Sequence, residues 1–184
     1  AAAVAELEPF SAAMARRLEL DGEVEQLASR FALKRRHWAL VGTGAGKIAA
    51  DEVRIKLSEL CYKSIAIDFL EDKKHIDLSS EPLILVCAAG LTGSNADDVA
   101  KEVAIYRAHK ATPIVIATEG EERYTAALQA LTVSATHPRL GFILAAMVGH
   151  LFGYEAALAI DAQAALLREA RASIEQLAAA HVDA

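Results

Sequence analysis

The chain has 184 residues, of which 54% are hydrophobic and only 5% aromatic, so we expect one domain with a sizeable core rather than two well-packed domains. Its 25 acidic and 19 basic residues give a formal net charge of −6, and without a dense lysine and arginine stripe interleaved with aromatics we expect no nucleic-acid partner. No positively charged segment followed by an apolar segment opens the chain, so we expect a cytoplasmic rather than a secreted protein.

A helical segment is predicted first, from about residue 4 to residue 32, with a break at Asp21-Gly22. The apolar run from Trp38 to Val41 ends in glycines, which is typical of a buried parallel strand. From residue 49 to residue 60 the apolar residues recur with the period of a helix. We therefore predict a strand and a helix on the two sides of a glycine-rich turn.

The same alternation continues along the chain and predicts a doubly wound α/β fold. Further strands are expected at 64–67, 83–87, 113–117 and 131–134, and further helices at 95–109, 121–130 and 138–160. Strands that alternate with helices form βαβ units with right-handed crossovers. We expect a mainly parallel five-stranded sheet flanked by helices, a flavodoxin-like or Rossmann-like sandwich in which ligands bind beyond the carboxyl ends of the strands.

Two apolar stretches lie near the C-terminus. The first, 140–160, contains His150 and Glu155, which favours a buried core helix over a membrane span. The second, 161–180, is rich in alanine and predicts an amphipathic helix that needs a partner. Its apolar face carries Leu166, Ala170, Ile174 and Leu177. The predicted organisation is an N-terminal helical segment (1–33), the sheet domain (34–160) and a C-terminal helix (161–184).

Glycines follow the first predicted strand. Gly42, Thr43 and Gly44 lead into Gly46-Lys47, where the next helix opens, so the backbone N–H groups could hold an anion. The spacing fits neither a Walker A loop nor the Rossmann fingerprint, and we expect no cofactor. A tight strand-to-helix turn without a ligand explains the same glycines, and spacing alone does not decide.

Glu52, Lys56 and Glu59 are spaced so that they share one face of the helix after this loop. An exposed ion pair is the simplest interpretation of the spacing. If the helix faces the open edge of the sheet, a carboxylate beside a lysine is instead a candidate base. It would move a proton between adjacent carbons of an open-chain sugar.

A second loop, 88–95, follows a predicted strand and carries Thr92 and Ser94. Hydroxyl groups near a helix N-terminus can hold phosphate oxygens. Ser94 or Asn95 explains the pattern equally well as a helix cap, and the aspartates directly after it would repel a phosphate. Both interpretations stay open.

The six histidines are scattered without the spacing of metal ligands, and the two cysteines, Cys61 and Cys87, lie among apolar residues. We expect no metal site and buried thiols in a reducing compartment. His75 lies in a polar stretch, where an exposed imidazole is free to act as acid or base.

Several of these residues together resemble one family, the isomerising glutamine:fructose-6-phosphate aminotransferases, or glucosamine-6-phosphate synthases. The resemblance is to the second sugar-isomerase (SIS) subdomain, whose pattern reads GRG, then a helix similar to ALEGALKLKE, then ELKHGP. It extends from about residue 24 to residue 161. The matching residues, without gaps, are Gly42-Thr43-Gly44, Glu52, Lys56, Glu59, Tyr62 and Lys74-His75.

The resemblance implies that Glu59 moves the proton between C1 and C2 of the open sugar phosphate, with Lys56 beside it. His75 would assist ring opening from a neighbouring subunit, so that a homodimer is needed for a complete site. The implied ligand is fructose 6-phosphate or glucosamine 6-phosphate. The expected substrate-binding residues are Gly42, Thr43, Gly44, Glu52, Thr92 and Ser94.

In this family a first SIS subdomain holds most of the phosphate site, and an amidotransferase domain precedes it, so this chain alone is expected to be nearly inactive. The family's KHGP is Lys74-His75-Ile76-Asp77 here, and residues 161–184 contain no counterpart of its NLAKSV segment. A non-catalytic SIS module that binds a phosphosugar for regulation or dimerisation is therefore the alternative.

Overall fold

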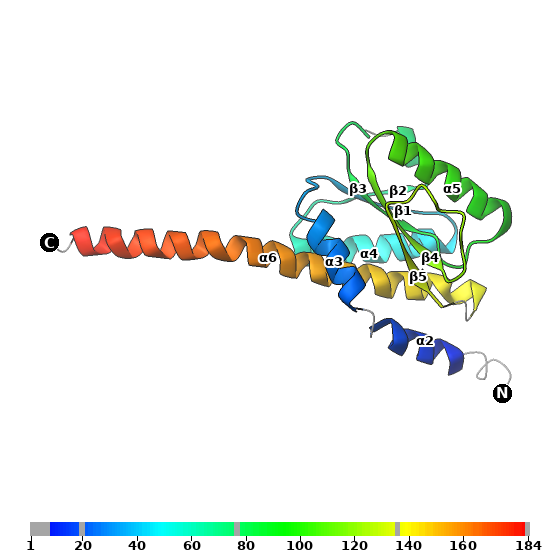
Figure 1. Ribbon diagram of the computed structural model, residues 1–184, viewed down its shortest axis with the longest axis horizontal. Helices are drawn as coiled ribbons and strands as arrows, with labels where there is room; N and C mark the ends of the chain where they lie inside the picture. The colour runs from blue at the N-terminus through cyan, green and yellow to red at the C-terminus, as the bar shows by residue number, and fades with distance from the viewer. Residues whose placement is uncertain (1–7, 19–20, 76–77, 135–136, 183–184) are drawn as a thin grey trace.

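The computed structural model describes residues 8–18, 21–75, 78–134 and 137–182 of the chain (Figure 1). The strands are β1 (Trp38–Gly42), β2 (Ala66–Phe69), β3 (Leu83–Cys87), β4 (Thr112–Thr118) and β5 (Gln129–Val133). The helices are α2 (Glu8–Leu18), α3 (Asp21–Phe31), α4 (Ala45–Cys61), α5 (Gly93–Ala108) and α6 (Gly141–Val182), with short 3-10 turns η1 (Asp72–His75) and η2 (Pro138–Leu140).

The five strands form one sheet in the order β2-β1-β3-β4-β5, and every neighbouring pair is parallel. This confirms the predicted doubly wound fold. The strand order reverses its direction between β1 and β3, because the chain first adds β2 on one side and then β3 to β5 on the other. In such sheets the loops beyond the carboxyl ends of the strands enclose the ligand site.

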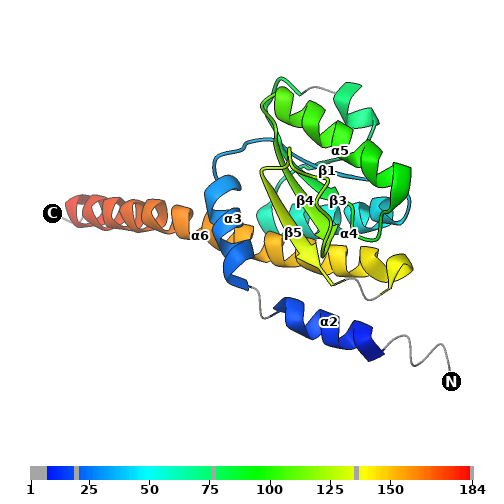
Figure 2. The same ribbon diagram turned by 45° about the vertical axis from the view of Figure 1, so that its right-hand side comes forward.

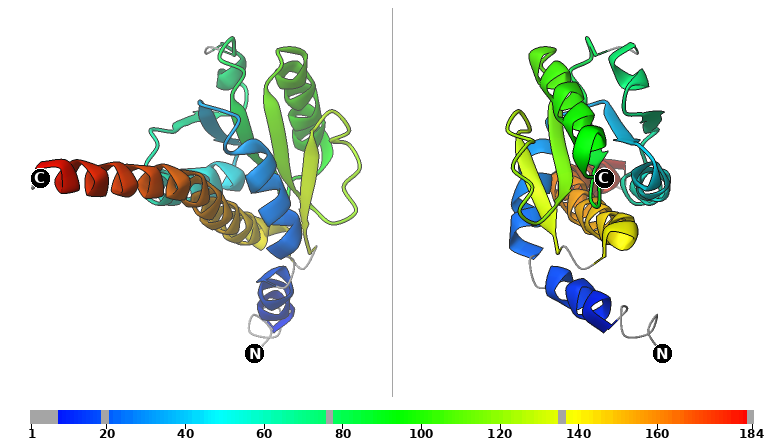
Figure 3. Two further views of the ribbon diagram at one scale, coloured as in Figure 1. Left: turned by 60° about the vertical axis from the view of Figure 1, so that its left-hand side comes forward. Right: turned by 90° about the vertical axis from the view of Figure 1, so that its right-hand side faces the viewer.

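Helices cover both faces of the sheet, as a parallel sheet requires. Alternate strand residues divide between two buried clusters, so that Leu40 and Leu85 face one layer while Val41 and Val86 face the other. The first layer contains α3, α4 and α6, and the second contains α5. Figures 1, 2 and 3 show α5 on one side of the sheet and the α4 and α6 pair on the opposite side.

The α4 and α6 helices pack closely because α6 carries glycine at the contact. A Cβ atom on Gly149 would lie 2.3 Å from a methyl carbon of Val53, and one on Gly153 would lie 2.6 Å from a methyl carbon of Leu57. Both neighbours are fully buried. The two glycines therefore fix the separation and register of the two helices.

The helix predicted at 121–130 is wrong. Residues 119–128 form a loop, and β5 begins at Gln129, earlier than the predicted start of the strand. Tyr124 is buried in the cluster beneath α5, and the Leu128 N–H donates to the carbonyl of Pro113, which starts the pairing with β4. Burial of a side chain and strand pairing together override the local helical preference of the segment.

The two stretches predicted as separate C-terminal helices form one helix, α6, of 42 residues. Its first half is a core helix, since Leu144, Val148 and Phe152 are buried. Within the described residues α6 is the one helix long and apolar enough to cross a membrane, and 44% of its most apolar window is buried inside the domain. Its second half stands clear of the domain in Figure 1.

Both cysteines are free and buried, as predicted. Burial raises the pKa of the Cys61 thiol to about 11 and that of the Cys87 thiol to about 12. Neither thiol is ionised near neutral pH, so neither has the character of a nucleophile or metal ligand.

Candidate functional site

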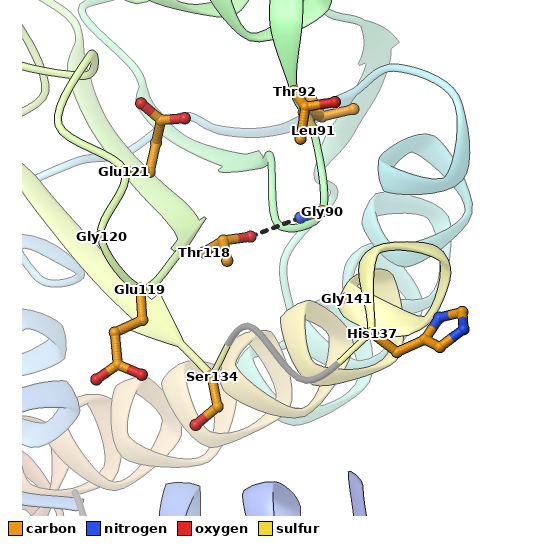
Figure 4. Close-up of a pocket in the computed structure, with 10 residues that line it drawn as sticks. All are labelled: Gly90, Leu91, Thr92, Thr118, Glu119, Gly120, Glu121, Ser134, His137 and Gly141. Atoms are coloured by element: carbon orange, nitrogen blue, oxygen red, sulfur yellow. Dashed lines mark hydrogen bonds between the residues drawn. The ribbon is translucent and has the colours of Figure 1, made fainter. Parts of the chain in front are cut away.

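A cavity of about 240 Å³ opens at the carboxyl ends of β3, β4 and β5 and beside the start of α6 (Figure 4). This is the edge at which a doubly wound sheet binds ligands. Its walls come from three loops and from the turn that precedes α6. The lining residues are Gly90, Leu91, Thr92, Thr118, Glu119, Gly120, Glu121, Ser134, His137 and Gly141.

The loop between β3 and α5 forms one wall of this cavity and is held in place by several contacts. The Gly90 N–H donates a hydrogen bond of 2.8 Å to Oγ1 of Thr118, and Gly90 has a φ of 84°, which favours glycine. A Cβ atom on Gly141 would lie 3.0 Å from the backbone of Ala89. The start of α6 therefore packs directly against this loop.

The wall also includes the start of α5. Thr92 is the residue before the helix, and its side chain makes no capping hydrogen bond. The first N–H groups of a helix have no partner within the helix and carry a partial positive charge. Hydroxyl groups of Thr92, Thr118 and Ser134 surround the same space. This set of donors suits an anion or a polyhydroxylated ligand.

A guanidinium group ties two walls of the cavity together. Arg123 donates to the carbonyl of Gly93 at 2.9 Å, to Asp97 at 3.1 Å and to Glu121. The Arg123 guanidinium lowers the pKa of the Glu121 carboxyl below its usual value. We call this set of contacts the Arg123 clasp. It links the loop after β4 to the start of α5 and neutralises the Glu121 carboxylate at the cavity.

A second basic group lies at the rim. Arg16 of α2 donates a hydrogen bond of 3.3 Å to Oγ of Ser134. It lines a smaller cavity of about 150 Å³ that shares Ser134 and Glu119 with the first. Figure 4 shows the side chains of Glu119 and Glu121 pointing in opposite directions, with the Glu119 carboxylate toward Ser134.

A separate cavity of about 360 Å³ lies beyond β1 and β2 and is acidic. Its carboxylates would repel a phosphate. Of the predicted glycine loop only Thr43 reaches it. The lining residues are Thr43, Phe69, Leu70, Glu71, Asp72, Asn95 and Asp98.

The glycine loop itself is a tight strand-to-helix turn. A Cβ atom on Gly42 would lie 2.4 Å from the backbone of Gly46, and one on Gly46 would lie 2.2 Å from the carbonyl oxygen of Cys87. Gly44 has a φ of 53°. Glycine is therefore required here for the close approach of α4 to β1 and β3, whatever binds nearby.

Glu52, Lys56 and Glu59 share one face of α4, as their spacing predicts. Lys56 donates a 3.0 Å hydrogen bond to Glu59, which raises the pKa of the lysine. The side chains are 43% and 60% exposed. Glu52 lies 3.4 Å from Nε2 of His150 on α6, a contact between distant segments that the sequence analysis did not predict.

These three residues do not lie at the mouth of the sheet, where the interpretation as a catalytic face would place them. The α4 helix begins at that edge and runs away from it, so Glu59 is about 21 Å along the helix from Ala45. Within the described part of the chain, neither the 240 Å³ cavity nor the 360 Å³ cavity at the carboxyl edge of the sheet is lined by any of these three residues. The structure brings the acid and the base together, but on an open surface.

His75 ends the short η1 turn and is exposed. The turn is held by its lysines, because Lys74 bonds to the buried Glu102 of α5 and the buried Lys73 lies 3.9 Å from Asp68 of β2. The hydrogen bond to Glu102 raises the pKa of Lys74. The next two positions of the family's KHGP motif, residues 76–77, lie outside the described residues.

Of the predicted residues in the second loop, Thr92 lines the cavity and Ser94 lies in the first turn of α5 without lining it. Sequence reasoning missed Thr118, Ser134, Arg16 and Arg123, which come from distant segments. His137 lines the cavity as well, and its Nδ1 accepts a 3.2 Å hydrogen bond from the Arg139 N–H at the start of η2.

No protein-family model matches the sequence, and no curated protein matches it significantly. Solved structures do match. The C-terminal domain of glucosamine-fructose-6-phosphate aminotransferase from Francisella tularensis superposes with a TM-score of 0.73 and 19% sequence identity, over 84% of this chain and 44% of that chain. The chain has the fold of an SIS domain. The resemblance stated from the sequence motifs is thereby confirmed at the level of the fold.

Two further structures extend this comparison of the SIS domain. The Vibrio vulnificus NanR protein, solved in complex with ManNAc-6P, matches with a TM-score of 0.61 and 13% identity over 97% of this chain and 67% of that chain. The sugar isomerase domain of the RpiR transcription factor from Sphaerobacter thermophilus matches with a TM-score of 0.55 and 16% identity, over 81% and 86%.

The chain therefore spans about half the length of the Francisella structure, at 44%. The matched SIS domains include part of an aminotransferase and part of a transcription factor. A shared fold does not decide between catalysis and ligand binding. That decision depends on the residues at the site.

Proposed function

We propose that this SIS domain binds a phosphorylated sugar in the cavity lined by Thr92, Thr118 and Ser134. The observation that carries the proposal is the meeting of these hydroxyl groups with the N-terminal ends of α5 and α6 at the carboxyl edge of the sheet. A phosphate is stabilised by helix N-termini and hydroxyl donors. The ManNAc-6P complex of NanR supports a phosphosugar as the ligand class.

The charges around the cavity fit a ligand with an anionic end and a neutral polyhydroxylated body. Arg16 supplies a cation beside Ser134, and the Arg123 clasp neutralises Glu121. Glu119 and His137 offer further polar groups for sugar hydroxyls. Phosphate binding beside Ser134 would keep the anion close to Arg16, and the sugar would then extend toward Thr92, which lies across the cavity at the start of α5 (Figure 4).

Calorimetric titration of the chain with fructose 6-phosphate, glucosamine 6-phosphate and ManNAc-6P tests this proposal. Thr92→Val keeps the shape of the side chain and removes its hydroxyl, so we expect a loss of roughly 10-fold or more in affinity. Thr125→Val makes the same change in an exposed loop away from the lining residues and should bind as the wild type does. Equal affinities in both variants, or no binding of any of the three sugars, would contradict the proposal.

A second, enzymatic role is favoured by the surroundings of the α4 ion pair. Lys56 and Glu59 lie among large apolar side chains that are exposed, namely Ile48 at 60%, Ile55 at 40% and Tyr62 at 96%. Such a stripe is a surface that another subunit or domain would cover. Covering it would desolvate the ion pair and could complete an isomerase site with His75, as the synthase resemblance implies.

In this enzymatic hypothesis the parent protein converts fructose 6-phosphate to glucosamine 6-phosphate, with Glu59 as the base. The test uses the full-length parent and follows proton exchange between C1 and C2. Glu59→Gln should abolish exchange while phosphosugar binding persists. Unchanged exchange in Glu59→Gln would rule out Glu59 as the base and leave the binding proposal intact. Phosphosugar binding without any exchange in the full-length parent would favour a non-catalytic regulatory module.

A further inference from the structure

The second half of α6, residues 161–182, leaves the domain and exposes large aliphatic side chains. We call this half the projecting segment. In proteins most of the stability of a helix comes from the packing of its apolar face rather than from the helical propensity of its residues. Its exposed aliphatic residues need a partner surface. They are Leu166, Leu167, Ile174 and Leu177, each between 67% and 73% exposed.

The apolar residues of the projecting segment follow a heptad spacing. Positions four and three residues apart alternate along one face, which is the spacing of a two-helix seam. When the same spacing is continued toward the N-terminus of α6, it includes Ala156 and Gly153, which are buried against the domain. The seam is therefore a continuation of the buried face of α6. It consists of Gln163, Leu167, Ala170, Ile174, Leu177 and His181.

The charges of the projecting segment lie away from this seam and are largely paired within the helix. Arg168 bonds to Asp161 at 2.9 Å, and Arg171 bonds to Glu175 at 2.7 Å. The seam itself has no acidic side chain and no lysine or arginine. An uncharged face does not complement an acidic or basic partner, but it does complement an identical uncharged face.

We propose that the projecting segment pairs with the same segment of a second copy of this chain, in antiparallel orientation. When two copies are aligned about Ala172, the seam matches itself residue by residue. Leu167 then meets Leu177 of the second copy, Ile174 meets the small Ala170, and Gln163 meets His181. Aliphatic layers form the centre, and a polar pair closes each end, a pattern that fixes register in paired helices.

The arrangement is also sterically reasonable and large enough. Antiparallel helices place the two domains at opposite ends of the pair, as the clear projection in Figure 1 allows. The seam from Gln163 to His181 is about 27 Å long. With Leu166 beside it, each copy contributes four large aliphatic side chains, which are at least 67% exposed in the single chain and would be covered by pairing.

The first test measures the oligomeric state of the full chain by sedimentation equilibrium between about 1 and 200 μM. We expect a dimer, and we expect Ile174→Glu to raise the dissociation constant at least 10-fold. Ala172→Glu adds the same charge on the opposite face of the helix and should remain dimeric. A wild type that is monomeric throughout, or an Ile174→Glu variant that dimerises as the wild type does, would overturn the proposal.

The second test determines the orientation by disulfide formation. The native Cys61 and Cys87 are buried and do not interfere. A chain carrying both Gln163→Cys and His181→Cys should form a covalent dimer under mild oxidation, whereas either substitution alone should not. Cross-linking of Gln163→Cys alone would show a parallel pair and refute the antiparallel arrangement. Circular dichroism of each variant verifies that the helix is retained.

Discussion

The cavity at the end of β3, β4 and β5 and the polar face of α4 both carry side chains suited to chemistry, but they are built differently. The cavity has concave walls, held by the Gly90 to Thr118 hydrogen bond and by the Arg123 clasp. The α4 face has a paired acid and base on a surface open to solvent. A pair of reactive side chains can therefore form without an enclosed site, as on α4, and an enclosed site can form without such a pair, as at the cavity.

The largest expected effect is on stability, and it comes from the glycine turn between β1 and α4, which positions α4 against the sheet. In Gly46→Ala the new Cβ would meet the Cys87 carbonyl oxygen at 2.2 Å. Since that neighbour is backbone and cannot rotate away, we expect a loss of about 3 kcal/mol in the free energy of unfolding. Urea unfolding followed by circular dichroism measures it.

Gly22→Ala is the matched control for that experiment, because nothing lies within 4 Å of its new Cβ. In a helix this change should be neutral or stabilising by up to about 1 kcal/mol. A Gly46→Ala variant as stable as Gly22→Ala would show that the close approach of α4 to β3 is not needed.

An intermediate effect is expected from opening the clasp. Arg123→Ala removes the bonds to Gly93, Asp97 and Glu121, so the two cavity walls lose their link and the Glu121 carboxylate regains its unpaired charge. We expect phosphosugar affinity to fall about 10-fold, with little change in thermal stability. Calorimetric titration and a melting curve of the same sample separate the two.

Lys101→Ala provides the comparison for the clasp, since it breaks an ion pair with Asp98 on the same helix, 72% and 52% exposed. Its phosphosugar affinity should equal that of the wild type. Equal losses of affinity in the two variants would mean that general electrostatics, rather than the clasp, governs binding.

The smallest effect is expected on the α4 face. Lys56→Met removes the hydrogen bond that raises the lysine pKa, but the pair is exposed. The midpoint of urea unfolding should therefore stay at its wild-type value. A clear fall in that midpoint would mean that the ion pair contributes to the stability of the fold, which would contradict its description as a solvent-exposed pair.

The fold was within reach of the sequence because its signals are local. Runs such as Leu83–Cys87 are apolar along their whole length, and each is followed by glycine or a polar turn. The segment at 121–130 failed because its outcome depends on a distant pairing, that of Gln129 with Ile114. Spacing along one chain segment carries no information about such a contact.

The candidate site was only partly predictable for the same reason. Thr92 was found, because a hydroxyl before a helix is a local pattern. Arg16, Thr118 and Ser134 come together only through the order of the strands and the placement of α2. Glu52, Lys56 and Glu59 were correctly predicted to share one face of α4. What that face contacts depends on the direction in which α4 leaves the sheet edge, and this direction is set by tertiary packing.

The unbroken α6 helix connects the cavity to the projecting segment. The helix begins with Gly141 in the wall of the cavity and continues for 42 residues, a length of about 63 Å. The contact of Gly149 and Gly153 with α4 holds the first half of the helix in place, and a rotation about this contact would displace the second half. A tilt of about one degree at the cavity moves the far end by roughly 1 Å, so the proposed phosphosugar site and the proposed helix pairing are connected by one continuous helix.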